Sequence, residues 1–188
     1  MPAEHAILGL LAISDDGGDG RGYGYDLARH FADDQPLGEV LHLEPGMLYH
    51  HLKKLERAGW VEASVQPQAN RPARRTYRLA ESGRAELLRW LEEPVTRTRE
   101  LRLEFLVKLY FARLVDPGRA DRLVAEQREA TQRQLASLEA QLRALASPGS
   151  EAASDPLSDF TATVLTLRRM QTEAALAWLD ALSEPVAR

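Results

Sequence analysis

The most regular alternation of apolar and polar positions in the chain begins at Pro45. Leu48, Leu52 and Leu55 recur at spacings of four and three residues, so they share one face of a helix. Pro45 suits the first position of that helix, where its missing N–H costs nothing. Gly46, His50, Lys53 and Arg57 are predicted on the opposite, basic and polar face, which Tyr49 and Lys54 flank. Together with Met47 these residues are the candidate DNA contacts of the helix.

Two short strands are predicted directly after this helix. Gly59 is typical of a helix stop, and residues 60–65 and 76–79 have the composition of strands. The polar loop between them contains Arg71, Arg74 and Arg75. A two-faced helix followed by a basic hairpin predicts a winged helix-turn-helix, whose recognition helix enters the DNA major groove.

Shorter apolar patterns surround this motif. Residues 6–13 form an apolar run that favours a buried first helix, and residues 23–33 predict a second helix with Leu27 and Phe31 on its inner face. We expect residues 14–22 to form a loop and residues 35–43 a connector. Residues 81–92 predict a further helix, which Pro94 ends.

The pattern changes after Pro94, where long helical periods replace the short elements. Residues 101–114 and 117–146 predict two helices, and a polar linker at residues 147–156 precedes a last one. The second of these helices has apolar positions at the spacing of a coiled-coil seam, namely Leu135, Leu138, Leu142 and Leu145. The last helix carries one stripe, composed of Phe160, Val164, Leu167, Gln171, Ala174, Trp178 and Leu182.

These C-terminal stripes need a partner, because so short a segment cannot form a large core of its own. A symmetric second copy of the chain is the partner that we expect. The alternative is that the stripes pack against the winged helix of their own chain. The fold class predicted is mainly α with a small β-hairpin wing. Residues 1–93 would form a winged helix-turn-helix DNA-binding domain, and residues 94–188 a dimerisation domain of antiparallel or coiled helices.

The charge of the chain gives two opposite indications. The 188 residues have a net charge of −4 and a pI of about 5.8, which argues against a nucleic-acid partner. Residues 47–78, however, contain seven basic residues and only two acidic ones. Because the Debye length is about 8 Å at physiological salt, DNA senses this local surplus more strongly than the distant acidic residues. We therefore expect double-stranded DNA as the partner.

Composition excludes several other kinds of protein. The chain has no cysteine, hence no disulfide and no thiolate metal site, and it has no apolar run of transmembrane length. Its N-terminus lacks the basic start of a signal peptide, so we expect a cytoplasmic location. His42, His50 and His51 lack ligand partners at metal-binding spacing, and we expect no metal and no cofactor.

The expected DNA contacts divide into two groups. Tyr49, Lys53 and Lys54 suit phosphates or base edges, and His50 suits donation to a base. The wing arginines Arg71, Arg74 and Arg75 suit the phosphate backbone, which sets affinity and register rather than sequence preference. An alternative for Tyr49 is a half-buried position in the core.

Other function classes have less support. The sequence contains no Gly-x-Ser-x-Gly motif, no phosphate-binding glycine-rich loop and no cysteine nucleophile, so no enzyme is expected. A winged helix that has lost DNA binding and serves as a protein-interaction module remains open, since the overall balance of charge is acidic. Trp90, Phe105, Tyr110 and Trp178 are candidates to line an apolar pocket between subunits, although such aromatic residues also suit a core.

The chain also resembles the PadR family of transcriptional regulators, over most of its length. The resemblance is carried by Leu8-Gly9-Leu10-Leu11, Gly24-Tyr25-Asp26-Leu27, the run from Gly46 to Val61, the wing Pro72-Ala73-Arg74-Arg75-Thr76-Tyr77-Arg78-Leu79, and Gly83. It implies a dimeric repressor that binds an operator near a promoter and releases it when a small effector binds. The aromatic candidates named above suit an apolar or aromatic effector.

Three positions depart from the family pattern. Glu44 replaces the usual Ser or Thr before the recognition helix, His50 replaces a frequent Pro, and Ala80 replaces the Thr that starts the helix after the wing. The first two lie at the DNA-facing end, so the base preference of the family does not transfer to this chain. The third removes a helix cap, at a cost of about 1 kcal/mol.

Overall fold

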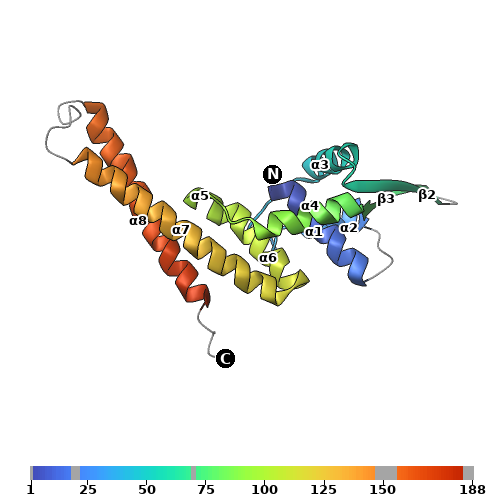
Figure 1. Cartoon of the computed structure of the whole chain (residues 1–188). Coiled ribbons are helices and arrows are strands. Elements are labelled where there is room, and N and C mark those ends of the chain that lie inside the picture. The colour runs from blue at the N-terminus through green and yellow to red at the C-terminus, as the bar shows by residue number, and fades with distance from the viewer. Residues whose placement is uncertain (1, 18–21, 69–70, 147–155, 184–188) are drawn as a thin grey trace. The chain divides into compact units, whose positions relative to one another are not determined.

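The computed structural model describes residues 2–17, 22–68, 71–146 and 156–183, without the side chains of 15–17, 66–68, 71–74, 117, 156–158 and 183 (Figure 1). These residues form two compact units. The first unit contains residues 1–93 and 103–120, and the second contains residues 94–102 and 121–188. The first segment of the first unit ends at residue 93, where we expected the boundary between domains. Residues 103–120, which we expected in the C-terminal domain, belong to the first unit.

The first unit is built around α1, which spans Pro2–Gly17. Ala6, Ile7 and Leu8 are completely buried, because α3, α4, α6 and β3 all pack against this helix. The predicted helix at residues 6–13 is confirmed, and the observed helix also includes residues 14–17, which were expected in a loop. Gly9 allows close approach of α6, since a Cβ there would lie 2.5 Å from the Phe111 ring.

Helix α2 spans only Gly24–Arg29, so the predicted helix at residues 23–33 was too long. Turns replace the helix beyond it and bring both Phe31 and Leu37 into the core, where each is 1% exposed. Asp, Pro and Gly residues between 33 and 38 favour these turns over further helix. The inner position predicted for Leu27 is confirmed, with 2% of the residue exposed.

The sheet has three antiparallel strands in the order β1-β3-β2, formed by Gly22–Tyr23, Arg71–Leu79 and Val61–Gln68 respectively. The wing hairpin is therefore longer than the predicted strands at residues 60–65 and 76–79. Strand β1 pairs Gly22 with Tyr77. It was not predicted, because two residues are too short to show a period.

Helix α3 spans Pro45–Arg57 and α4 spans Glu81–Glu92, as the sequence predicted. Gly59 follows α3 with φ at 73°, a left-handed backbone that an L side chain rarely adopts. This glycine stops the helix and redirects the chain into β2. Together α1 to α4 and the hairpin form the predicted winged helix-turn-helix.

The predicted helix at residues 101–114 is present, but its first five residues are π-helical rather than α-helical. α5 (Thr98–Glu100) leads into a π-helical turn at Leu101–Phe105, and α6 (Leu106–Val115) follows. Long helices α7 (Pro117–Leu145) and α8 (Pro156–Ser183) complete the chain, and residues 147–155 lie outside the described part. None of the helices in the described ranges is both long and apolar enough to cross a membrane.

The second unit is held by polar contacts as well as apolar ones. The Gln127 amide bonds both backbone groups of Val95, accepting from its N–H at 2.7 Å and donating to its carbonyl at 3.0 Å. Arg128 on α7 donates to Asp180 on α8. Of the predicted seam on α7, Leu138 is buried at 2% exposure, whereas Leu135, Leu142 and Leu145 are half-buried.

Candidate nucleic-acid interface

Helix α3 divides cleanly into two faces. Leu48, Leu52 and Leu55 are at most 1% exposed and fix the helix on the core. The candidate DNA contacts of this helix, both on the outer face and beside it, are exposed: Gly46, Met47, Tyr49, His50, Lys53, Lys54 and Arg57. The sequence period therefore gave the orientation of this helix correctly.

A buried carboxylate from α1 holds α3 from beneath. Glu4 is 5% exposed and bonds the Lys54 ammonium at 2.6 Å and His51 Nδ1 at 3.3 Å. Burial raises the pKa of Glu4, but the hydrogen bonds from Lys54 and His51 favour the charged form, and the resulting pKa is below its ordinary value. A charged Glu4 consequently fixes both the position and the rotation of α3.

The two neighbouring lysines of α3 differ in their surroundings. Lys54 remains 56% exposed at its side chain, yet its ammonium is engaged by Glu4. Lys53 and Arg57 have no ion pair within the described ranges. Lys53 and Arg57 are thus the α3 cations whose charge is fully available to an external anion.

Tyr49 occupies a position between surface and core. The residue is 49% exposed, while its ring lies on the first residue of α2, so close that a Cβ on Gly24 would be 2.7 Å from Tyr49 Cε1. The ring is therefore fixed by packing and still presents part of its surface outward. Both interpretations made from the sequence, an outward residue and a half-buried one, apply in part.

An ion pair between Arg75 and Glu56 ties the wing to α3. Arg75 Nη2 donates to both carboxylate oxygens of Glu56, at 2.8 and 2.6 Å, and its guanidinium lies 5.7 Å from the centre of the Tyr77 ring. Ser64 and Thr76 join the two strands through a hydroxyl contact of 2.7 Å. The side chains of Arg71 and Arg74 lie outside the described residues.

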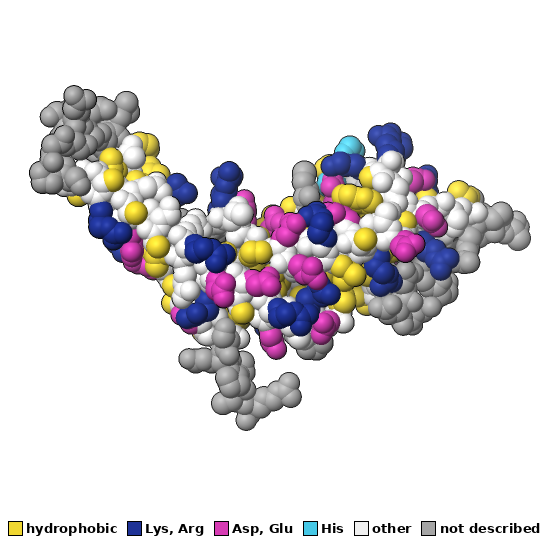
Figure 2. All heavy atoms as spheres, in the orientation of Figure 1, with side chains coloured by type: hydrophobic (Ala, Val, Ile, Leu, Met, Phe, Trp, Pro, Cys, Tyr) yellow, Lys and Arg dark blue, Asp and Glu magenta, His cyan; other side chains and the backbone are white. Residues whose placement is uncertain are grey.

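Acidic groups gather at the N-terminal end of α3. His42 bonds Asp33 at 2.9 Å and Glu44 at 3.2 Å, and these hydrogen bonds to Glu44 and Asp33 raise the pKa of His42. Glu44 precedes the helix without making a side-chain cap bond. Figure 2 shows basic and acidic side chains close together around α3 rather than one uniformly basic patch.

The arrangement provides hydrogen-bond donors and positive charge on a rigid helix, which suits an anionic, hydrogen-bonding partner. Within the described ranges, no three His, Cys, Asp or Glu residues are placed to hold a metal ion. Two participants were missed from the sequence, Glu4 and Glu56. They lie 50 and 19 residues from their partners, so no local pattern could indicate the contacts.

Family models match both halves of the chain. Residues 11–89 match the transcriptional regulator PadR-like family, and residues 101–184 match the family described as the C-terminal region of virulence activator alpha. The first match runs from within α1 to within α4, and the second covers the π-helical turn, α6, α7 and α8. The first match ends at residue 89 and the second begins at residue 101, on either side of the boundary between the two units at residue 93.

Individual relatives agree with these matches. The negative transcriptional regulator PadR of Bacillus subtilis is 27% identical, over 95% of this chain and 94% of its own length. A probable transcriptional regulator of Mycobacterium tuberculosis is 36% identical over 53% of this chain, a span of about half (48%) of that relative's length. A crystal structure of Bacillus subtilis PadR with operator DNA is similar at 26% identity and a TM-score of 0.44, covering 96% of each chain.

Proposed function

The chain belongs to the PadR-like family of DNA-binding transcriptional regulators, and we propose that it is a dimeric repressor that a small molecule releases from its operator. The family consists of transcriptional regulators rather than enzymes. The repressor role is supported by the relative of nearly full length, which is a negative regulator. We place the protein in the cytoplasm, where it has access to the DNA.

The observation that carries this proposal is the outer face of α3. Lys53 and Arg57 project from a helix whose other side is fixed by three buried leucines and a buried carboxylate. A rigid helix with cationic donors fits the major groove, where Lys pairs with the acceptors of guanine. Arg75 and the other wing arginines would contact phosphates and set the register.

Two copies are required in this proposal. One winged helix reads few base pairs, whereas a two-fold pair reads a palindrome with half-sites about 34–36 Å apart. Part of the apolar stripe of α8 is exposed: Phe160 is 66% exposed, Leu167 56% and Met170, beside the stripe, 56%. Apolar groups exposed along several turns of a helix are typical of a contact surface between subunits.

A hollow in the first unit suits the expected apolar or aromatic effector. Its volume is about 320 Å³, and its lining consists of Val40, Leu106, Leu109, Tyr110, Arg113 and Leu114. Apolar side chains around one aromatic ring and one cation resemble the usual composition of small-molecule sites. A ligand that prefers one conformation of the dimer would shift operator affinity by its difference in affinity for the two states.

Selection from a random pool of duplex DNA tests the proposal. We expect a palindromic site to be enriched, and the affinity for that site to fall steeply with salt because bound phosphates release counterions. The Lys53→Ala/Lys54→Ala variant should lose specific binding to this site while it retains the fold. A pool that yields no motif, together with no salt-dependent affinity for random duplex, would favour the alternative of a protein-interaction module.

A further inference from the structure

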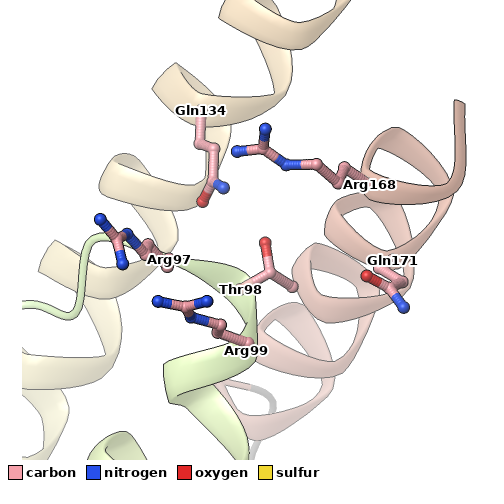
Figure 3. Close-up of a pocket in the computed structure, with 6 residues that line it drawn as sticks. All are labelled: Arg97, Thr98, Arg99, Gln134, Arg168 and Gln171. Atoms are coloured by element: carbon pink, nitrogen blue, oxygen red, sulfur yellow. The ribbon is translucent and has the colours of Figure 1, made fainter. Parts of the chain in front are cut away.

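Three arginines of the second unit surround a hollow that the proposed DNA and effector contacts do not use. Its volume is about 480 Å³, within the usual range for small-molecule sites. It is lined by Arg97, Thr98, Arg99, Gln134, Arg168 and Gln171. Figure 3 shows Arg168 extending from α8 towards Gln134 on α7, across the hollow from Arg97 and Arg99.

The guanidinium groups that line this hollow are not held in ion pairs by the described residues around them. Within the described ranges, none of the three guanidinium groups forms an ion pair. The nearest acidic residues in sequence accept hydrogen bonds from groups other than these guanidiniums. Glu100 accepts from the backbone N–H of Arg97 at 3.0 Å, and Glu173 accepts from Arg169 on the same helix.

Arg97, Arg99 and Arg168 are all exposed, so water and salt weaken the repulsion among their like charges without removing it. An anion placed between them would offset this repulsion, and the planar guanidinium matches carboxylate and phosphate groups with two parallel hydrogen bonds. The Gln134 amide and the Thr98 hydroxyl add neutral hydrogen-bonding groups to the lining. The chemistry of the hollow therefore favours a polar anion over an apolar molecule.

Three chain segments converge at the hollow. Thr98 Oγ1 lies 2.9 Å from Thr172 Oγ1, which brings the α5 segment against α8. The same segment continues directly into the π-helical turn at Leu101–Phe105, a rare geometry that often marks functional sites. A ligand bound by both Arg97, which directly precedes α5, and Arg168 would bridge this segment and α8.

We propose that this hollow binds a small organic molecule with two or more oxyanion groups, carboxylate or phosphate, held by Arg97, Arg99 and Arg168. The site lies within one unit and consists of residues of the second unit only. It is separate from the apolar hollow in the first unit, so it would give the protein a second, chemically different ligand. Its existence does not depend on the DNA-binding proposal.

Titration calorimetry of the full chain at constant ionic strength tests this site, with citrate and inorganic phosphate as probes and chloride as the reference salt. We expect saturable binding of at least one probe and a higher unfolding temperature in its presence. Removing one charge-assisted partner weakens binding by about 10- to 100-fold. We therefore expect this loss in Arg97→Gln and in Arg168→Gln, and no loss in Arg102→Gln, an exposed arginine of the same segment outside the lining.

Other outcomes would overturn the proposal. If neither probe binds saturably, the hollow is not an anion site. If Arg97→Gln, Arg168→Gln and Arg102→Gln all bind the probe with the same affinity, the binding is only a general effect of ions. If the Arg97→Gln/Arg168→Gln variant loses duplex DNA affinity instead, the arginines serve DNA phosphates. If the same variant changes only the sedimentation of the protein, they belong to a contact between two copies. Circular dichroism of each variant confirms that the fold is retained.

Discussion

Helices α3 and α8 both bury one side, but they expose opposite chemistry on the other. The outer face of α3 is basic and polar, with Lys53 and Arg57 exposed. The outer stripe of α8 is apolar, with Phe160 and Leu167 more than half exposed. The first face is stable in water without a partner, whereas the second gains free energy by leaving water. This difference supports the proposal that α3 contacts an anionic partner and that α8 contacts a second apolar surface.

The largest effect is expected from charge on the α8 stripe. Phe160→Glu/Leu167→Glu would place two carboxylates in the proposed subunit contact and convert the dimer to a monomer. Since paired half-sites gain about 10²- to 10⁴-fold in affinity from linkage, we expect operator affinity to fall by about that factor. Sedimentation equilibrium and a gel-shift titration measure the two effects.

Thr166→Glu is the matched control for that experiment. Thr166 is exposed on the same helix but lies off the stripe, so dimer and affinity should stay unchanged. A stable dimer in the Phe160→Glu/Leu167→Glu variant would show that the subunit contact lies on other helices, and the comparison of α3 with α8 would fail.

The next effect distinguishes the two lysines of α3. Lys53→Ala should weaken operator binding by about 10- to 100-fold, because a direct contact in the major groove is worth about 1–3 kcal/mol. Lys54→Ala should weaken it less, because Glu4 already engages that ammonium. Equal losses in both variants, measured by fluorescence anisotropy at one salt concentration, would show that the Glu4 contact does not divide their roles.

A smaller effect is expected for the buried anchor of α3. Glu4→Gln removes the charge that accepts from Lys54 and His51, and we expect the free energy of unfolding to fall by about 1–3 kcal/mol at neutral pH. The folded pKa of Glu4 is lowered, so its stabilisation is present above the ordinary value of 4.5 and is lost as pH falls through the folded pKa.

Urea unfolding of wild type and Glu4→Gln from neutral pH to below pH 4 measures this dependence. The difference in stability between the two proteins should be constant above the ordinary pKa and shrink below it. A difference that instead grows on acidification would mean that Glu4 is held in its neutral form.

The smallest effect concerns the ion pair between α3 and the wing. Glu56→Gln should raise affinity for all duplex sequences a few-fold, by roughly 1 kcal/mol or less, because it removes a nearby negative charge and releases Arg75. Arg75→Gln should weaken binding uniformly and reduce the salt slope by about 0.9 if one phosphate contact is lost. A changed sequence preference in Arg75→Gln would show that the wing reads bases.

Much of the fold could be predicted because its patterns are local. The period of Leu48, Leu52 and Leu55 set the buried face of α3, and Gly59 set its end. The change of pattern near Pro94 and the apolar stripe of α8 are also visible in the sequence, but the pattern did not show that residues 103–120 belong to the first unit. Helix period and chain-breaking residues act over a few positions, so these features survive in the sequence alone.

Tertiary structure decided which charges are available. Lys53 and Lys54 are equivalent in the sequence, and only the fold places Glu4 beneath one of them. The fold also shortened α2, added β1, inserted the π-helical turn and brought Arg97 and Arg168 to one hollow. Each of these outcomes depends on contacts between residues far apart in the chain. A local pattern therefore determines which face a residue occupies, whereas only packing determines its partner.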